Sequence, residues 1–300
     1  MKQKKFFVLT MAMLFALSAC EKPIVEEEAD LGGQKTTVAD ANVVIRVSDF
    51  RFTPYEDARQ TRTVEDITSY STRFNFVIYK DGKKVESRSQ MKGDDGYGQV
   101  SMKLEPGTYK LLVLAHSSLG GNPTLSDPEK IQFTNKLSYS DTFYYYDNLT
   151  VTEEAETHNI VLTRASSKLS FTINDAIPSN VKYIYFYYTG GSGVLNAVTG
   201  YAGNVDSQQT MAFSTASRTS PATFDVFTFL KEDEGKLQLT VTATDEDNKV
   251  VIERQFTDVP MKRNMMTVYS GNFFDHSSQN DFSFTAETGW EVFSNQTYGN

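Results

Sequence analysis

Between residues 237 and 243 the chain reads LQLTVTA, so apolar and polar side chains alternate. Successive side chains of a β-strand point to opposite faces, and this alternation is therefore typical of a strand with one buried and one wet face. The pattern predicts that Leu239 is buried in a core and that Thr240 is exposed to water.

Residues 168–173, KLSFTI, repeat the alternation and predict that Phe171 is buried while Ser170 is wet. The segment from 74 to 78 places three apolar side chains on one face and runs into Asp81-Gly82. An Asp-Gly pair after such a segment favours a tight hairpin turn, because both turn positions need positive φ. Antiparallel strands are therefore expected.

Further strands are expected at 41–47, 98–104, 109–115, 158–163, 181–188, 223–229, 249–257 and 265–274. Of these, 181–188 is apolar on both faces and is expected to be a central strand. No segment after the N-terminal one shows a capped apolar stripe with the helical period. Many short strands with Gly, Pro and Asp turns predict an all-β chain built of antiparallel β-sandwiches.

The expected strands fall into two groups, separated by the small polar stretch RASS at 164–167. We expect an N-terminal β-sandwich at 41–163 and a C-terminal β-sandwich at 164–300, each of ordinary domain size. The segment 117–142 is rich in Gly, Pro, Ser and Asp. It is expected to be a surface excursion, because a buried loop leaves backbone polar groups without partners.

Residues 1–19 have the layout of a secretory signal peptide. Three lysines precede an apolar run from residue 6 to residue 17, which is too short to span a membrane, since spanning takes about 20 apolar residues. The sequence LSAC at 17–20 resembles the lipobox of bacterial lipoproteins. That resemblance implies that Cys20 carries the lipid, and two or more acyl chains make a stable membrane anchor.

Residues 20–40 are polar, contain no aromatic residue and include EEE at 26–28. Such a stretch buries too little apolar surface to offset its ordering entropy, so a flexible tether is expected. The acidic run also resembles the signal that marks Bacteroidetes lipoproteins for the outer face of the outer membrane. The expected location is therefore the cell outer membrane, lipid-anchored and surface-exposed.

The formal net charge of −9 excludes a typical nucleic-acid binder, which carries basic patches. Cys20 is the only cysteine of the chain. The folded part therefore has no disulfide, no cysteine zinc site and no cysteine nucleophile. No stretch after the signal is long and apolar enough to span a membrane as a helix.

No motif indicates catalysis. His116, His158 and His276 are widely spaced and are interpreted as ordinary strand-end or surface histidines. The acidic stretch 245–248 lacks the downstream Gly and Glu of a calcium loop and is expected to be a solvated turn. The glycine-rich stretch 190–193 has no phosphate-loop lysine and is expected to be a flexible loop. We expect no enzyme activity, no catalytic residue, no metal site and no cofactor.

Two aromatic clusters are candidates for stacking against sugars. They are FYYY at 143–146 and the alternating tyrosines Tyr183, Tyr185 and Tyr187. In a two-sheet fold such residues more often belong to the core or to cross-strand pairs. The core interpretation is the favoured one.

A lipobox, a polar tether and two consecutive β-sandwiches resemble the fimbrillin-related anchor and accessory subunits of the type V fimbriae of Bacteroidales, including the FimB-like lipoproteins. The local matches lie at LEPGTY (104–109), RASSKLSF (164–171) and RNMMTVYSGNFF (263–274). The resemblance covers most of residues 40–300. It implies a pair of transthyretin-like sandwiches and a role as a fimbrial subunit in adhesion.

In that family, polymerising subunits lose their first strand to an Arg-directed protease and accept a strand from a neighbour, a form of β-strand addition. The resemblance thus implies other fimbrial subunits as partners, with a ligand on a host or bacterial surface as a further one. The first expected strand is 42–47, and Arg46, Arg51, Arg59 and Arg62 lie in or after it. We interpret these arginines as ordinary strand and loop charge, with cleavage sites as the other interpretation.

Residues 282–292 are interpreted either as a donor strand or as a strand that closes its own sheet, with Trp290 as a large anchor. Two other functions remain open. One is a surface glycan-binding lipoprotein of a polysaccharide-uptake system, which would show an exposed aromatic platform beside polar groups. The other is a structural surface lipoprotein without a polymer partner.

Overall fold

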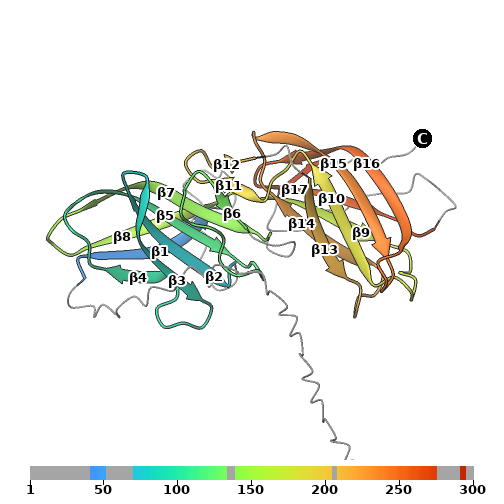
Figure 1. Ribbon diagram of the computed structural model, residues 1–300, viewed down its shortest axis with the longest axis horizontal. Helices are drawn as coiled ribbons and strands as arrows, with labels where there is room; N and C mark the ends of the chain where they lie inside the picture. Colours follow the sequence, from blue (N-terminus) through green and yellow to red (C-terminus); the bar gives the residue numbers. More distant parts are fainter. Residues whose placement is uncertain (1–40, 52–69, 134–138, 205–207, 276–290, 295–300) are drawn as a thin grey trace, which may run out of the picture. The chain divides into compact units, whose positions relative to one another are not determined.

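The computed structural model describes residues 41–51, 70–133, 139–204, 208–275 and 291–294 (Figure 1). These residues form 18 strands and no helix, which confirms the all-β prediction. Since the described residues contain no helix, none of them forms a helix that could cross a membrane. The expected signal peptide, the tether and Cys20 lie outside the described residues.

The first sandwich is one sheet that folds over on itself, with the strand order β3-β2-β5-β7-β8-β1-β4. β7 and β8 pair only through Phe143 with Arg164 and Tyr144 with Thr163, so the sheet divides beyond these pairs. The bounds are β1 Val43–Arg51, β2 Arg73–Lys80, β3 Lys83–Met91, β4 Gln99–Met102, β5 Gly107–His116, β7 Thr142–Val151 and β8 Glu156–Arg164. All neighbours pair antiparallel except β1 and β8, which are parallel.

The two halves of this sheet enclose one apolar core. Val43 and Ile45 of β1 meet Phe74 and Phe76 of β2 and Leu162 of β8, and none of these side chains is more than 1% exposed. Burial of such side chains is the main stabilising term of the sandwich, at roughly 1.5–3 kcal/mol each. The core therefore depends on β1 as much as on the strands of the opposite half.

The expected hairpin turn joins β2 to β3. Asp81 and Gly82 have φ angles of 51° and 74°, the positive values that a tight hairpin of this type needs. The Asp-Gly pair thus accounts for the local register of this hairpin.

The second sandwich packs two sheets of four strands, in the orders β13-β10-β15-β16 and β14-β9-β17-β18. The bounds are β9 Ser167–Ile173, β10 Tyr183–Thr189, β13 Gln209–Ser214, β14 Ala222–Thr228, β15 Glu234–Thr244, β16 Val250–Lys262, β17 Met265–Gly271 and β18 Glu291–Ser294. Phe171, Phe186, Phe224 and Leu239 lie in the core between the two sheets. The β-sandwich prediction is confirmed, and the neighbouring strands pair antiparallel except β9 with β17 and β17 with β18, which are parallel.

The prediction that Ser170 is wet is wrong. Ser170 is only 9% exposed. Its strand β9 lies between β14 and β17, and Ser170 is opposite Asp225 on one side and Val268 on the other. A small side chain on a central strand is covered by its larger neighbours, which the alternation of a single strand does not reveal.

The register of β15 predicts that two neighbouring substitutions lower the free energy of unfolding by unequal amounts. Leu239 is 2% exposed within the core, so Leu239→Ala should lower the free energy of unfolding by about 2–5 kcal/mol. Thr240→Ala on the opposite face should change it by less than about 1 kcal/mol. Urea unfolding of both variants measures the difference. Equal losses at the two positions would refute the register.

A third sheet covers the outer face of the first sandwich. It has the order β12-β11-β6, with β6 Ile131–Gln132, β11 Val194–Asn196 and β12 Tyr201–Ala202. Leu195 of β11 and Ile131 of β6 pack with Leu112 and Leu114 of β5 in one buried cluster. β5 is therefore buried on both faces, as its continuous apolar run suggests.

This sheet corrects two expectations. The segment 117–142 is not only a surface excursion, since Leu125, Ile131 and Phe133 are at most 6% exposed. The stretch 190–193 is not a simple flexible loop, because the backbone of Ser192 exchanges two hydrogen bonds with Phe229. Both predictions fail because β2 and β5 have a second apolar face, which the sequence of the two segments does not reveal. The third sheet and its flanking residues bury this face.

Candidate functional site

The first strand, β1, lies inside its half-sheet rather than at its edge (Figure 1). It pairs antiparallel with β4 and parallel with β8. Val43, Ile45 and Val47 point into the core and are 1%, 0% and 5% exposed. Arg46 points outward and donates from Nε to Gln99 Oε1 of β4 at 2.8 Å. Removing β1 would therefore uncover backbone groups of two strands and one side of the core.

Both ends of β1 are fastened. The Asn42 side chain donates to the carbonyl oxygens of Leu104 and Thr152, at 2.9 and 2.8 Å, and accepts the Leu104 N–H. Near the other end Phe50 is 5% exposed and meets the Phe143 ring edge-on, with 4.9 Å between centroids. The strand extends to Arg51, beyond the expected end at residue 47.

The arginines named above divide into two groups. Arg46 is paired with Gln99 across the strand, and Arg51 is the exposed last residue of β1. Arg59 and Arg62 lie outside the described residues. Arg51 is thus the described arginine at which a cut would separate β1 from the rest of the fold.

The C-terminal candidate segment is described only at its end. β18 pairs parallel with β17, with Met265 opposite Glu291 and Met266 opposite Val292. The two last residues of the 282–292 segment therefore belong to a strand that extends their own sheet, while the rest, including Trp290, lies outside the described residues. β18 is the last strand at this edge of the sheet.

The far end of β17 is held by one carboxylate. Asp175 accepts the backbone N–H groups of Phe273, Phe274 and Asp275 at 2.8, 2.6 and 2.7 Å. Charge-assisted bonds of this kind are about twice as strong as neutral ones. Asp175 accordingly joins the loop after β9 to the chain after β17.

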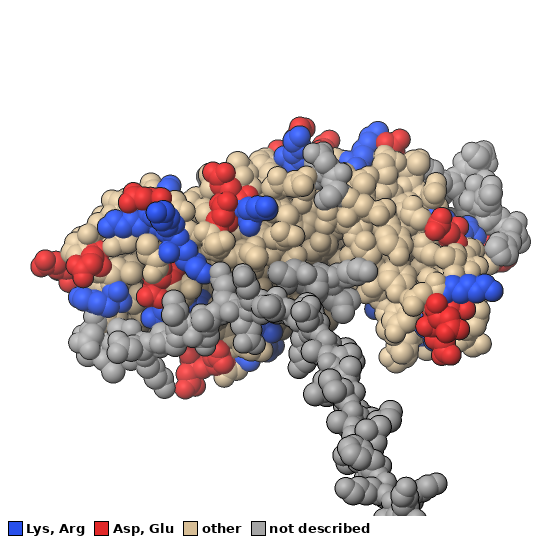
Figure 2. All heavy atoms as spheres, viewed as in Figure 1, with Lys and Arg blue, Asp and Glu red and all other residues tan. Residues whose placement is uncertain are grey.

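No group of three His, Cys, Asp or Glu side chains suited to a metal ion occurs among the described residues. Asp245–Asn248 forms the turn between β15 and β16, in which Asp245 Oδ1 accepts the N–H groups of Asp247 and Lys249. On the face shown in Figure 2 acidic and basic side chains lie intermixed. His276 lies outside the described residues, and His158 lies in β8 with Nε2 3.9 Å from Glu156 Oε2.

His116 stands at the end of β5, as expected of a strand-end histidine, but it is fully buried rather than at the surface. Its Nδ1 accepts the Ser118 N–H at 3.1 Å, so Nε2 carries the proton and donates to Asn75 Oδ1 at 3.0 Å. Burial, with a smaller effect of the Arg73 charge, lowers the pKa of His116 from 6.5 to about 3. The imidazole is therefore neutral in the folded chain.

This histidine predicts a loss of stability in acid. Between about pH 6.5 and pH 3 the unfolded chain binds a proton at His116 and the folded chain does not, so the free energy of unfolding falls as the pH falls, by up to roughly 1.4 kcal/mol per unit. His116→Gln should reduce this dependence. Urea unfolding of both chains at pH 7 and pH 4.5 measures it, and identical pH dependence in both would contradict the assignment.

The two aromatic clusters behave differently. Phe143 is buried in the core of the first sandwich, whereas Tyr144, Tyr145 and Tyr146 are half-buried. Tyr144 accepts a hydrogen bond from Arg263 Nη2 at 3.3 Å, and the Lys110 ammonium lies 5.6 Å from the Tyr146 ring centre. Phe143 is thus a core residue, and the three tyrosines pack against buried clusters and pair with β5, in line with the core and cross-strand interpretation.

For the tyrosines of β10 the core interpretation is wrong. Tyr183 is 40% exposed, and Tyr185 and Tyr187 are half-buried, whereas the residues between them are buried. The three rings therefore lie on the outer face of their sheet, with Tyr185 and Tyr187 stacked at 5.9 Å between centroids. The alternation YIYFYY already contained this signal, since only one face of a strand in a two-sheet sandwich can meet the core.

Comparison with known proteins identifies one family whose model matches most of the chain. The model of a family described as "Family of unknown function (DUF6562)" matches residues 36–297. None of the curated proteins compared with the chain matches it.

Several solved structures are similar in chain path. A "putative adhesin" from Bacteroides ovatus is 16% identical, with 73% of this chain and 84% of that chain covered and a TM-score of 0.47. A fimbrial assembly protein from Parabacteroides distasonis is 12% identical, with coverage of 80% and 92% and a TM-score of 0.40. The tip fimbrial protein Mfa3 from Porphyromonas gingivalis, truncated at its C-terminus, is 11% identical, with coverage of 80% and 97% and a TM-score of 0.38. At these identities and TM-scores the similarities alone assign no function to this chain.

Proposed function

The chain belongs to the family of unknown function DUF6562, and we propose that it is a lipid-anchored cell-surface subunit of an adhesive, fimbria-like assembly. In this proposal it is joined to other subunits by β-strand addition. The observation that supports the proposal best is the place of β1, an N-terminal strand that completes the core of the first sandwich between two other strands. Partners are other subunits of the assembly, and Cys20 supplies the attachment to the outer membrane.

The order of parts along the chain supports this role. Cys20, the polar tether and β1 follow one another directly in the sequence. A strand from another subunit can take the place of β1 only if β1 leaves it. Displacement alone keeps the covalent path from the lipid to the fold, whereas a cut after Arg51 would release the folded part from its anchor.

The chemistry of β1 fits strand addition. Its backbone pairs with β4 on one side and β8 on the other, and Val43, Ile45 and Val47 enter the core from alternate positions. A replacing strand would gain affinity from the same main-chain bonds and specificity from the same alternate side chains. If the place of β1 stayed empty, β4 and β8 would expose unpaired backbone groups and could pair with unrelated strands.

We further propose that 41–163 and 164–300 are two domains. Arg164 ends β8, and β9 begins at Ser167. Arg164 Nε donates to Asp141 Oδ1 and Arg164 Nη2 donates to Asp141 Oδ2, each at 2.9 Å. These two hydrogen bonds fix the chain at this junction. The third sheet supports a close association of the two, because β6 comes from the first and β11 from the second.

A second candidate function is a surface glycan-binding lipoprotein of a polysaccharide-uptake system. It is favoured by the row of partly exposed tyrosines on the outer face of β10. Neither role includes an enzymatic step. The two roles differ in their partner, which is a filament in the first and an outer-membrane transporter in the second.

Copurification distinguishes the two roles. Cells that produce the tagged full chain are sheared, and surface filaments are isolated and compared with membranes stripped of filaments. The fimbrial role predicts that the chain is enriched with the filaments and joined to them after mild crosslinking. A chain that stays entirely with the membranes, crosslinked to a transporter, would refute that role in favour of the glycan-binding one.

A further inference from the structure

β8 has a free edge along most of its length. One side of this strand pairs parallel with β1, while the other side meets β7 only at Thr163 and Arg164, the last two residues of β8. Beyond these two pairs the sheet divides. Within the described part of the chain, residues 156–162 therefore have no strand on the side that faces away from β1.

The ladder with β1 shows which backbone groups lie at this edge. Alternate residues of a strand direct both their N–H and their C=O group to the same neighbouring strand. The Glu156 N–H donates to the Asn42 carbonyl oxygen at 3.1 Å, and the Ile160 carbonyl oxygen accepts from Ser48 Oγ at 2.9 Å, so Glu156 and Ile160 face β1. The residues whose backbone groups face the free edge are Thr157, Asn159 and Val161.

The outer edges of the first sandwich, at β3 and β4, are covered by one side chain. Gln90 of β3 accepts the Gly98 N–H and donates to the Gln99 carbonyl oxygen, each at 2.9 Å. β3 also begins with Lys83 and Lys84, and charged side chains on an edge strand oppose pairing with other strands. These two edges are therefore poor sites for strand addition.

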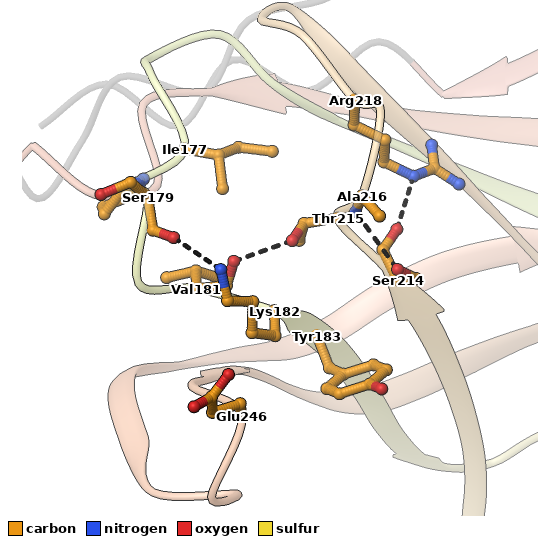
Figure 3. Close-up of a pocket in the computed structure, with 11 residues that line it drawn as sticks. Ile177, Ser179, Val181, Lys182, Tyr183, Ser214, Thr215, Ala216, Arg218 and Glu246 are labelled. Atoms are coloured by element: carbon orange, nitrogen blue, oxygen red, sulfur yellow. Dashed lines mark hydrogen bonds between the residues drawn. The ribbon is translucent and has the colours of Figure 1, made fainter.

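In the second sandwich, arginines protect the edges. Arg218 joins β13 to β14, since its Nε donates to the Ser214 carbonyl oxygen at 3.1 Å (Figure 3) and its Nη1 to the Thr223 carbonyl oxygen at 2.7 Å. In the edge strand β16, Arg254 lies over the Phe273 ring of the core, 5.7 Å from its centre. An inward-pointing charge on an edge strand also opposes pairing.

No such side chain protects the edge of β8 within the described part of the chain. Residues 157–163 read THNIVLT and include no Asp, Glu, Lys or Arg. Four of these seven residues are β-branched, a type that is enriched in strands. Thr157 and Asn159 are exposed, and Val161 is 38% exposed. The edge of β8 therefore combines unpaired backbone groups with a neutral sequence that favours strand pairing.

The sequence of this edge is compatible with pairing to itself. Asn159 lies at the middle of the free stretch, so two antiparallel copies of β8 centred there place Asn159 opposite its counterpart and Thr157 opposite Val161 of the second copy. All three facing pairs join edge-facing residues and can exchange two hydrogen bonds each, about six in all. Glu156 falls opposite Leu162 of the second copy. Like charges, which destabilise a facing pair, are therefore kept apart.

We propose that β8 pairs antiparallel with β8 of a second copy of this chain. The resulting interface is a two-fold, isologous one, in which the same strand contributes from both copies. It joins the two first sandwiches through one continuous sheet and leaves each β1 in its place. The pairing goes beyond the proposed function and needs neither the lipid nor the exchange of β1, so failure of either proposal is distinguishable from failure of the other.

Disulfide trapping of the purified full chain in detergent tests this pairing. Asn159→Cys places a thiol on the two-fold axis, about 4.5–5.5 Å between Cβ atoms from its counterpart, close enough for a disulfide after small adjustment. Arg46→Cys is the matched control, because Arg46 is exposed and lies opposite Asn159 in β1. In the dimer, Arg46 would lie three strand spacings, or about 14 Å, from its counterpart.

We expect Asn159→Cys to form a covalent dimer under oxidising conditions, and Arg46→Cys and the native chain to form none. The native chain, which contains Cys20, controls for disulfides through that thiol. Equal linkage in the two variants, or no linkage through Asn159→Cys, would overturn the proposal.

Sedimentation equilibrium gives a second measurement that needs no added thiol. The native chain should have twice the mass of one chain. Asn159→Lys sets two ammonium groups opposite each other and should weaken dimerisation at least about tenfold. Gln238→Lys adds the same charge at an exposed position of β15 and should leave the dimer intact. A monomeric native chain, or equal effects of the two lysine variants, would contradict pairing through β8.

Discussion

Replacing Cys20 by Ala is expected to abolish both acylation and stable membrane attachment. The thiol that takes the lipid is the only one in the chain, and the apolar segment before it is too short to anchor the protein by itself. Cells grown with a labelled fatty acid should give a labelled native chain and an unlabelled variant. In fractionation, the variant should leave the outer membrane.

The matched control is Glu21→Ala, which changes the next residue and keeps the thiol. It should be labelled and retained as the native chain is. A Cys20→Ala variant that still takes up label and stays with the outer membrane would refute the anchor.

Arg164→Ala is expected to destabilise the fold by about 3–5 kcal/mol. The Arg164 side chain is 3% exposed, pairs with Asp141 through Nη2 at 2.9 Å, and lies over Phe143 with 4.9 Å to the ring centre. Its removal leaves the Asp141 carboxylate, which is only 23% exposed, without its cation. Urea unfolding at pH 7 should show a large drop in the transition midpoint.

An exposed ion pair provides the comparison. Lys236 and Asp258 lie 3.6 Å apart with side chains 65% and 63% exposed, and such pairs contribute about 0–1 kcal/mol. Lys236→Ala should accordingly have little effect on stability. Equal losses for the two variants would mean that the junction at Arg164 does not depend on its buried ion pair.

Much of the fold followed from the sequence because single-strand patterns report burial directly. Leu239 and Phe171 are buried as the alternation predicts, and Asp81 and Gly82 form the predicted hairpin turn. Ser170 was predicted wrongly because its exposure depends on the neighbouring strands, which no local pattern specifies. The third sheet was missed for a similar reason, since its strands come from segments about sixty residues apart.

Whether a candidate site could be predicted likewise depends on how local its signal is in the sequence. A lipobox is a local signal, so Cys20 could be predicted from four residues, although it lies outside the described part of the chain. The tyrosine row was present in the alternation but was assigned to the wrong face.

The central claim, that another strand takes the place of β1, is tested most directly by locking β1 in place. Arg46 and Gln99 lie opposite each other in β1 and β4, and Cβ atoms of opposed residues are about 4.5–5.5 Å apart, close enough for a disulfide after small adjustment. Arg46→Cys combined with Gln99→Cys should therefore tie the two strands under oxidising conditions, with each single variant as a control.

The measurement is the amount of chain incorporated into isolated filaments by the double variant, in its oxidised form and after reduction. The account predicts that the oxidised form is folded and lipid-anchored but absent from filaments. It also predicts that the reduced form and both single variants enter filaments as the native chain does. Incorporation of the oxidised, locked chain at the native level would contradict the claim.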